Sequence, residues 1–228
     1  MNNNTNKQPN NEIKKIAIYV DADDTIMKSS EAVIKILNKK YNITPPKTIK
    51  DLRDWRYRSI YGLLGNDEVD NIFDSDEFFD VVELDNEFLS FYKANQEYFS
   101  FIVVTKGTKD NLKKKEEYLK KILGDSFEFV GIETKRQQYD EYYDKELGFK
   151  RRKIDKSSVN MRHGIQIDDR TDNLVTTNAP VKILYKHGSD MYWNRDYENV
   201  NNLYAVNTWK EIIDILLFAR DNHCLFKK

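Results

Sequence analysis

The chain has 228 residues, of which 39% are hydrophobic and 13% aromatic, so it can bury a sizeable core and is not a disordered protein. Its 37 Lys and Arg and 38 Asp and Glu give a formal net charge of -1, which argues against a polyanion partner such as duplex nucleic acid. The one cysteine, Cys224, cannot form an internal disulfide, and no apolar segment approaches the roughly 20 residues that span a bilayer. We therefore expect a cytoplasmic protein with no membrane partner and, given the charge balance, a small phosphorylated substrate.

The first predicted strand ends in an acidic loop. Residues 1–12, rich in Asn and without apolar periodicity, predict a disordered tail that lacks the apolar core of a secretory signal. The apolar run Ile16–Val20 then predicts a buried strand and is followed by Asp21, Asp23 and Asp24. Open α/β sheets place ligands at the carboxyl ends of strands, and close carboxylates repel one another unless a cation or a proton compensates. The segment predicts a site for a hard divalent ion such as Mg²⁺ and for an oxyanion substrate.

Other interpretations compete for this acidic loop. Asp24 and Thr25 are residue types that commonly form a turn or cap a helix, and for Asp21 alone a structural role would be the better prediction. A calcium loop of the EF-hand kind is excluded because Ile26 stands where the sharp turn needs Gly. The strand that precedes the carboxylates favours the functional interpretation.

The segment 29–96 has helical character. Apolar residues recur at helical spacing, as in the pair Phe88 and Tyr92, and Pro45 and Pro46 separate the first helix from the next. Because this segment follows the acidic loop directly, it predicts a small helical cap above the carboxyl ends of the strands.

A second predicted strand, Phe99–Val104, ends in Thr105-Lys106-Gly107-Thr108, directly before a predicted helix over Lys109–Leu123. A hydroxyl, a Gly and the backbone N–H groups at a helix start can cradle an anion, because the unpaired donors and the helix dipole favour negative charge. A simple helix cap is the competing interpretation. The charge run Lys113–Glu117 inside this helix predicts a solvated face rather than a binding patch.

The alternation of strands and helices continues to the end of the chain and predicts an α/β fold, with a central, mostly parallel sheet flanked by helices. The polar insertion Ile132–Lys153 has three open roles: covering the site, mediating a homodimer, or neither. The predicted strand Ile165–Ile167 ends in Asp168 and Asp169, which repeats the pattern of the acidic loop. The remaining predicted elements are Phe127–Val130, Val181–Tyr185, Leu203–Val206 and a final helix with a capping box of Thr208 and Glu211.

The histidines have no metal-ligand spacing and are assigned no catalytic role: His163, His187 and His223.

The polar segments resemble the motifs of a known family. Asp21-Ala22-Asp23-Asp24-Thr25 is similar to the first motif of the haloacid dehalogenase (HAD) superfamily, Thr105 to its second, Lys156 to its third and Asp168-Asp169 to its fourth. Asp24 stands where many relatives carry Gly. The resemblance implies a Rossmann-like core over residues 13–28 and 97–228, with the cap inserted as residues 29–96.

Several shorter sequence motifs resemble those of one branch of this superfamily, the 5'(3')-deoxyribonucleotidases. They are Asp155-Lys156-Ser157, Asp168-Asp169-Arg170, Asn194-Arg195 and Asn207-Thr208-Trp209-Lys210-Glu211. Lys156 lies slightly farther from Asp168 than this branch suggests, so Lys150 and Lys153 are alternatives for the third-motif lysine. The resemblance implies a Mg²⁺-dependent enzyme that hydrolyses deoxyribonucleoside monophosphates.

The motifs lead to a hypothesis of mechanism. Asp21 would attack phosphorus and form an aspartyl-phosphate, while Asp23 would act first as general acid and then as general base. Mg²⁺ would be bound by Asp21, the Asp23 backbone carbonyl and Asp169, with support from Asp168. The phosphate oxygens would be bound by Thr105, Lys106, Gly107 and Lys156.

Aromatic residues of the cap are candidates for nucleobase stacking, each contributing on the order of 1–3 kcal/mol: Trp55, Phe78 and Phe79. The competing interpretation is that these rings build the core of the cap. Two other functions remain open: a HAD phosphatase for another small phosphometabolite or a polynucleotide end, and a non-catalytic protein that binds a phospho-ligand. Loss of Asp21 or Asp23 would indicate the latter, and both residues are present.

Overall fold

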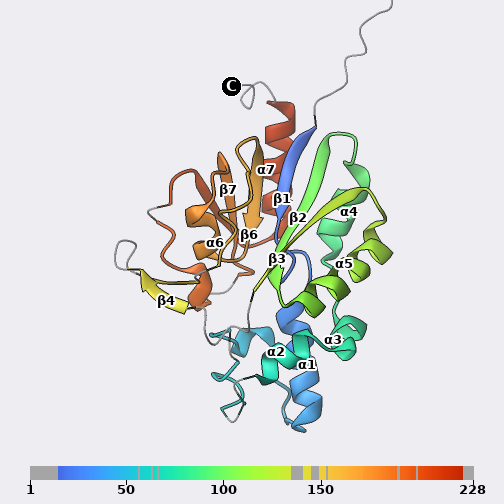
Figure 1. Ribbon diagram of the computed structural model, residues 1–228, viewed down its shortest axis with the longest axis vertical. Coiled ribbons are helices and arrows are strands. Elements are labelled where there is room, and N and C mark those ends of the chain that lie inside the picture. The colour runs from blue at the N-terminus through green and yellow to red at the C-terminus, as the bar shows by residue number, and fades with distance from the viewer. Residues whose placement is uncertain are drawn as a thin grey trace, which may run out of the picture.

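The computed structural model describes residues 15–55, 57–62, 64–65, 67–134, 141–144, 149–152, 154–188, 191–198 and 200–222. Parallel strands form one central sheet in the order β3-β2-β1-β6-β7-β8 (Figure 1). The sheet confirms the predicted α/β, Rossmann-like fold. Its strands are β1 Ile16–Val20, β2 Phe99–Gly107, β3 Phe127–Glu133, β6 Gly164–Asp168, β7 Val181–Tyr185 and β8 Leu203–Val206. A separate antiparallel pair, β4 Glu141–Asp144 and β5 Phe149–Arg152, lies within the predicted insertion.

The two faces of the sheet pack against different apolar clusters. Ile16, Ile18 and Val20 of β1 contribute to the larger core, whereas Ala17 and Tyr19 pack against a smaller cluster, as the period of two in a strand requires. Helices that contribute residues to the larger core include α4 Asn86–Ala94, α5 Lys109–Leu123 and α7 Trp209–Asp221. A short helix, α6 Thr171–Thr176, follows β6.

The register of β1 places the acidic motifs side by side. Val20 pairs with Ile167 of β6 and with Val103 of β2. Asp21, one residue farther along, therefore lies beside Asp168 and near the end of β2. Both helix predictions at the motifs are confirmed: α5 spans Lys109–Leu123, and Thr208 and Glu211 form a capping box at the start of α7.

Within the range 29–96, expected from the sequence to be the cap, the last helix packs on the core. The chain enters and leaves the cap side by side, because Met27 pairs with Leu84 in an isolated antiparallel bridge and Asp85 N–H donates to Ile26 C=O at 2.8 Å. Helix α4 follows this crossing and packs on the core, with the Phe88 ring 5.1 Å from Trp209 of α7. Its apolar face therefore covers the sheet rather than the site. The cap contains α1 Ser29–Lys40, the 3-10 turn η1 Ile49–Asp51, α2 Glu68–Phe73 and α3 Asp76–Val81.

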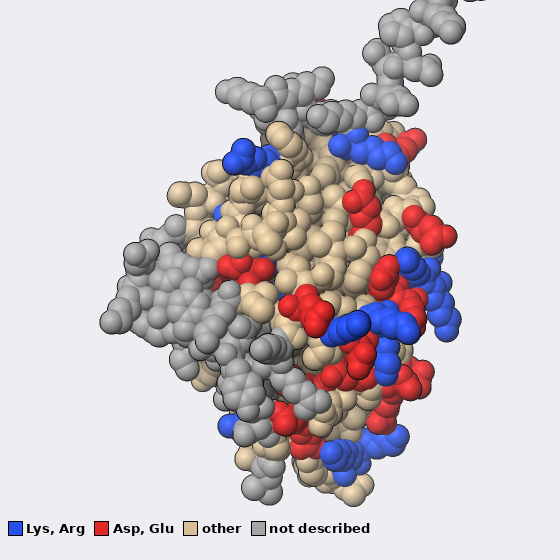
Figure 2. All heavy atoms as spheres, in the orientation of Figure 1, with Lys and Arg blue, Asp and Glu red and all other residues tan. Residues whose placement is uncertain are grey.

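Charged side chains of both signs lie intermixed on the described part of the surface shown in Figure 2. Ion pairs among the described residues include Lys114–Asp76 at 2.6 Å and Lys120–Glu116 at 2.7 Å. Exposed pairs of this kind contribute less than about 1 kcal/mol each. Within the described residues, no helix combines the length and the apolar character needed to cross a membrane.

Candidate active site

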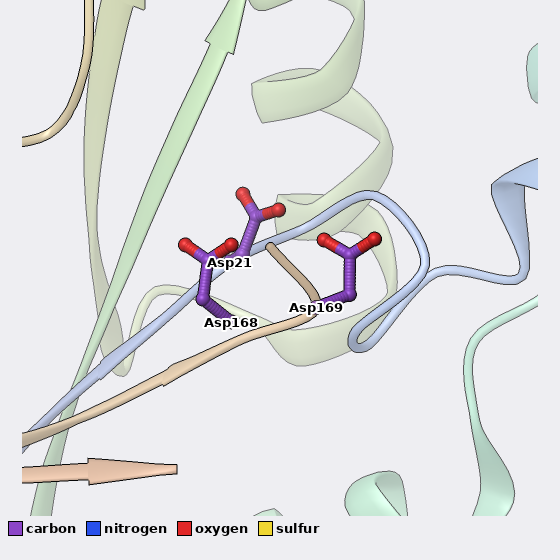
Figure 3. Close-up of side chains that lie close together, drawn as sticks. All are labelled: Asp21, Asp168 and Asp169. Carbon is purple, nitrogen blue, oxygen red and sulfur yellow. The ribbon is translucent and has the colours of Figure 1, made fainter. Parts of the chain in front are cut away.

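Carboxylates from two neighbouring strands meet at the carboxyl edge of the sheet. Asp21 follows β1, Asp168 is the last residue of β6, and Asp169 comes directly after it. One oxygen of each lies within 4.8 Å of the others, and all three side chains are buried (Figure 3). The sequence predicted this juxtaposition because parallel strands that are neighbours end at the same edge.

Lys156 is the buried cation of this cluster. Its Nζ lies 2.6 Å from Asp21 Oδ1 and 2.7 Å from Asp168 Oδ2, and the side chain is 1% exposed. Burial by itself would lower the pKa of Lys156, but the Asp168 and Asp21 carboxylates outweigh it and raise that pKa. Of the alternatives considered for this role, Lys153 lies outside the described residues, and for Lys150 the structure describes only the backbone.

One ammonium does not balance three carboxylates. Burial, followed by repulsion from Asp168 and Asp21, raises the pKa of Asp169 well above its usual value. Arg170 beside it binds Asp172 through Nε and Nη2 at 3.0 and 3.1 Å, so its charge has a partner of its own. A compact set of hard oxygen donors with excess negative charge fits a divalent cation such as Mg²⁺.

Neighbouring donors fix the orientation of the two aspartates at the end of β6. Asn173 Nδ2 donates to Asp168 Oδ1 at 2.9 Å, and the indole N–H of Trp193 donates to Asp169 Oδ2 at 2.5 Å. Trp193 lies in the short turn η3 Tyr192–Asn194, far along the chain. No local sequence pattern marks it, and only the fold reveals its contact with Asp169.

Asp23 is held from both sides and does not join the cluster. Its Oδ1 accepts from Ser29 Oγ at 2.8 Å, and its Oδ2 lies 2.5 Å from Lys115 Nζ. Lys115 is fully buried, so the expectation that Lys113–Glu117 is wholly a solvated face is wrong at this position. The signal was present in the sequence, because Lys115 shares the apolar face of α5 with Leu112 and Leu119.

The segment at the end of β2 is divided between the protein interior and the site. Thr105 is fully buried, and its Oγ1 accepts from Lys115 Nζ at 3.1 Å. Lys106 Nζ donates to Asn173 Oδ1 at 2.7 Å. Gly107 is on the cavity wall, and a Cβ there would collide with the Asn111 side chain. A side chain at position 107 would therefore displace the Asn111 side chain from its present place.

A small cavity of about 70 Å³ lies above the cluster, between the core and the cap. Its floor includes Asp21, Asp23 and Asp169, and its cap side includes Trp55 and Phe73, whose rings stack 5.5 Å apart at 14°. The other described residues that line it are Asp70, Asp74, Lys106, Gly107, Thr108, Asn111, Thr134, Arg170 and Asn173.

Phe78 and Phe79 take a different place from the one expected. Phe78 is fully buried between Phe73 and Phe79, with ring centroids 4.9 and 5.0 Å away. Phe79 packs in turn against Tyr118 of α5. Among the described residues that wall the cavity, Trp55 is present and these two rings are not. Of the expected stacking residues, the structure therefore brings only Trp55 to the site.

The 194–195 loop lies near the site without lining its cavity. The side chain of Asn194 is buried, and the Arg195 backbone carbonyl accepts from Thr171 Oγ1 at 2.7 Å. The Arg195 guanidinium lies over the Tyr192 ring, 4.9 Å from its centroid. This loop therefore holds η3, and with it Trp193, against the start of α6.

Asp24 links the acidic loop to the cap. It has a φ of 51°, a left-handed conformation that suits Gly better than a residue with a side chain. Its Oδ1 accepts from Ser30 N–H at 2.7 Å and its Oδ2 from the Ser30 hydroxyl. Burial is the main cause that raises the pKa of Asp24 to about 7.

The fold is shared with solved structures that are remote in sequence. A haloacid dehalogenase-like family hydrolase from Streptococcus pneumoniae has a TM-score of 0.52 and 14% identity, over 89% of this chain and 98% of that one. A HAD-superfamily hydrolase of subfamily IA from Geobacter sulfurreducens has a TM-score of 0.50 and 13% identity, over 89% and 96%. Protein tyrosine kinase A of Mycobacterium tuberculosis has a TM-score of 0.58 and 11% identity, over 89% and 98%.

These likenesses define the class of fold, a HAD-type α/β core. No protein-family model matches the sequence, and no curated protein was found to be similar to it. Since two of the three structures are named hydrolases and one a kinase, the fold by itself does not select a reaction. The function has to be argued from the site.

Proposed function

We propose that this protein is a Mg²⁺-dependent phosphomonoesterase. The observation that carries the proposal is the buried cluster of Asp21, Asp168 and Asp169, in which Lys156 pairs with Asp21 and Asp168, while Asp21 and Asp169 line a cavity between core and cap. Such a cluster provides a nucleophile, hard ligands for a cation and a fixed positive charge within one small space. The motifs that resemble those of HAD phosphatases support the same chemistry.

The proposed reaction has two steps. An Asp21 oxygen forms a bond to phosphorus, the bond to the leaving-group oxygen breaks, and Asp23 gives that oxygen a proton. Asp23 then takes a proton from the water that hydrolyses the aspartyl-phosphate. Lys156 and the Lys106 and Gly107 backbone amides offset the charge that accumulates on the phosphate oxygens. Mg²⁺ held by Asp21, the Asp23 carbonyl and Asp169, with Asp168 in support, would reduce the repulsion between the nucleophile and the substrate.

Deoxyribonucleoside monophosphates are the proposed substrates. The resemblance to 5'(3')-deoxyribonucleotidases supports them, and Trp55 offers a ring on the cavity wall for a base. Because the cavity of about 70 Å³ is small for a whole nucleotide, the proposal includes an outward movement of the cap when the substrate enters. The same small volume favours a second candidate, a phosphatase for a smaller phosphometabolite.

Phosphate release from a panel of compounds tests these assignments. Deoxyribonucleotides, ribonucleotides, sugar phosphates and a phosphorylated oligonucleotide would be compared with Mg²⁺ and with EDTA. Metal-dependent turnover strongest on deoxyribonucleoside monophosphates would support the proposed substrates. Turnover strongest on small phosphometabolites would support the second candidate, and absence of turnover throughout would favour a non-catalytic binding protein.

Truncation of the cap ring separates the two candidates further. Trp55→Leu should lower kcat/KM for nucleotides about 10-fold, since base stacking contributes on the order of 1–3 kcal/mol, and should leave aryl phosphate hydrolysis nearly unchanged. Phe79→Leu is the matched control, because Phe79 lies outside the cavity wall. Equal losses on both substrates would assign Trp55 to cap folding.

A further inference from the structure

Lys115 is a second buried lysine that the proposed chemistry does not yet use. It is fully buried in the middle of α5, whereas the Lys113 side chain is 76% exposed. Lys115 Nζ lies 2.5 Å from Asp23 Oδ2 and 3.1 Å from Thr105 Oγ1. Among the described residues that wall the cavity, Asp23 is present and Lys115 is not. Any effect of Lys115 on a bound substrate therefore passes through the residues it contacts.

The Asp23 carboxylate is clamped between the cap and the core. Ser29, the first residue of cap helix α1, donates to Oδ1 at 2.8 Å, and Lys115 of core helix α5 contacts Oδ2. Rotation of the carboxyl group would break one of these contacts. Charge-assisted hydrogen bonds of this kind are the stronger ones in proteins, so the orientation of the group is well defined.

Lys115 also orients the Thr105 hydroxyl. An oxygen that accepts a hydrogen bond from an ammonium must direct its own O–H elsewhere. One cation thus fixes both the proposed general acid and the buried hydroxyl of Thr105, which the sequence suggested for phosphate binding but which does not line the cavity.

We infer that Lys115 and Ser29 are positioning residues for phosphoryl transfer, which present Asp23 to the leaving-group oxygen. The inference rests on the proposed phosphomonoesterase function. In the first step, which begins with Asp23 protonated, the Asp21–phosphorus bond forms, the phosphorus–oxygen bond to the leaving group breaks, and the proton moves from Asp23 to that oxygen, leaving the Asp23 carboxylate paired with the Lys115 ammonium. A misoriented Asp23 impairs only the last of these events.

This distinction predicts a dependence on the leaving group. A nitrophenolate departs without a proton, whereas an alkoxide needs one as the bond breaks. Since kcat/KM reports the steps up to the first irreversible one, it isolates this transfer from the later hydrolysis of the aspartyl-phosphate. If Asp23 is misoriented, the loss in kcat/KM should therefore increase with the pKa of the leaving alcohol. A general structural defect should instead lower kcat/KM by the same factor for all esters.

The test compares Lys115→Met and Ser29→Ala with Lys113→Met as the control, on aryl and alkyl phosphates of graded leaving-group pKa in the presence of Mg²⁺. Lys115→Met should lower kcat/KM about 100-fold on alkyl phosphates, the low end of the effect of general acid catalysis, and less than about 5-fold on 4-nitrophenyl phosphate. Ser29→Ala should show the same trend at about 10-fold, because it removes one hydrogen bond to a charged group. Lys113→Met should match the wild type on every ester.

Each outcome either supports or overturns the role of Lys115 and Ser29 in positioning Asp23. A uniform loss across the series, or no loss, in folded Lys115→Met would overturn the inference while leaving the proposed function in place. If thermal melting shows that Lys115→Met does not fold, Ser29→Ala decides alone by the same criterion. A wild-type protein that hydrolyses no ester would overturn the proposed function, and the inference with it.

Discussion

The acidic loop from Asp21 to Thr25 has two halves, and a different buried lysine holds each. On the core-facing half, Asp21 shares Lys156 with Asp168 at the end of the neighbouring strand. On the cap-facing half, Asp23 lies between Lys115 and Ser29. Lys156 is surrounded by more carboxylates than it can neutralise, whereas Lys115 contacts one carboxylate and one hydroxyl.

The difference shows how one short loop can combine two tasks. The core-facing half concentrates charge, which suits a cation and a phosphoryl group, and its geometry is set by the register of β1 and β6. The cap-facing half sets orientation, and its geometry depends on how α1 and α5 pack on either side of the loop. Substitutions in the core-facing half should therefore abolish the reaction or metal binding. Substitutions in the cap-facing half should instead change the orientation of the reacting groups.

The largest effect is expected at the core-facing end of the loop. Asp21→Asn should lower kcat by at least about 10⁴-fold, because the amide cannot act as the nucleophile, with melting behaviour close to that of the wild type. Phosphate release with Mg²⁺ and thermal unfolding by circular dichroism measure the two quantities. A well-folded Asp21→Asn variant with substantial turnover would remove Asp21 from this role.

Lys156 should come next in magnitude. Lys156→Ala should lower kcat/KM about 10³-fold, as for removal of one preorganised donor to developing charge, whereas Lys153→Ala should stay within about 3-fold of the wild type. Steady-state kinetics on the best ester of the panel compares them. The reverse ranking would assign the third-motif role to Lys153.

Metal binding tests the excess charge of the core-facing half. Mg²⁺ at about 100 times its Kd should stabilise the wild type by about 2.7 kcal/mol, and Asp169→Asn should lose most of this gain. In EDTA the same variant should be at least as stable as the wild type, because one of three mutually repelling carboxylates is gone. Urea denaturation with Mg²⁺ and with EDTA gives all four values. Equal Mg²⁺ stabilisation of both proteins would contradict the role of Asp169.

The smallest effect is expected at Asp24 on the cap-facing half and concerns stability against pH. Its folded pKa of about 7 lies above the usual value of 3.8, so the folded protein binds the extra proton between these values, and stability falls as pH rises from about 4 to about 7. In Asp24→Asn this loss, about 1.4 kcal/mol per pH unit and so on the order of 3 kcal/mol between pH 5 and pH 7, should be absent. Urea denaturation in EDTA at pH 5 and pH 8 compares the two proteins, and identical pH dependence would contradict the assignment.

Much of the core-facing half could be predicted from the sequence. Short apolar runs that end in carboxylates predict buried strands, and parallel strands bring their ends together, so Asp21, Asp168 and Asp169 were predicted to meet. The cap-facing half could be predicted only in part. Lys115 stands at helical spacing between Leu112 and Leu119, but its charged neighbours concealed that position. Trp193 reaches Asp169 through a loop contact that no spacing encodes.

The aromatic residues of the cap illustrate a further limit. Adjacent rings such as Phe78 and Phe79 look alike in a sequence, and both are suited to a base or to a core. Helix α3 buries Phe78 within the cap and turns Phe79 toward Tyr118, while Phe73 at the end of α2 reaches the cavity. Packing of helices shorter than two turns decided this, since their sequence carries too few residues to define an apolar face.

The sequence by itself determined the α/β fold, the position of the acidic edge and the identity of its carboxylates, because strand period and polar termination are local properties of the chain. The tertiary structure alone decided which lysine lies behind Asp23, which indole holds Asp169 and which cap ring faces the site. Those contacts join residues far apart in the chain, and they depend on how the cap, α5 and η3 pack against one loop.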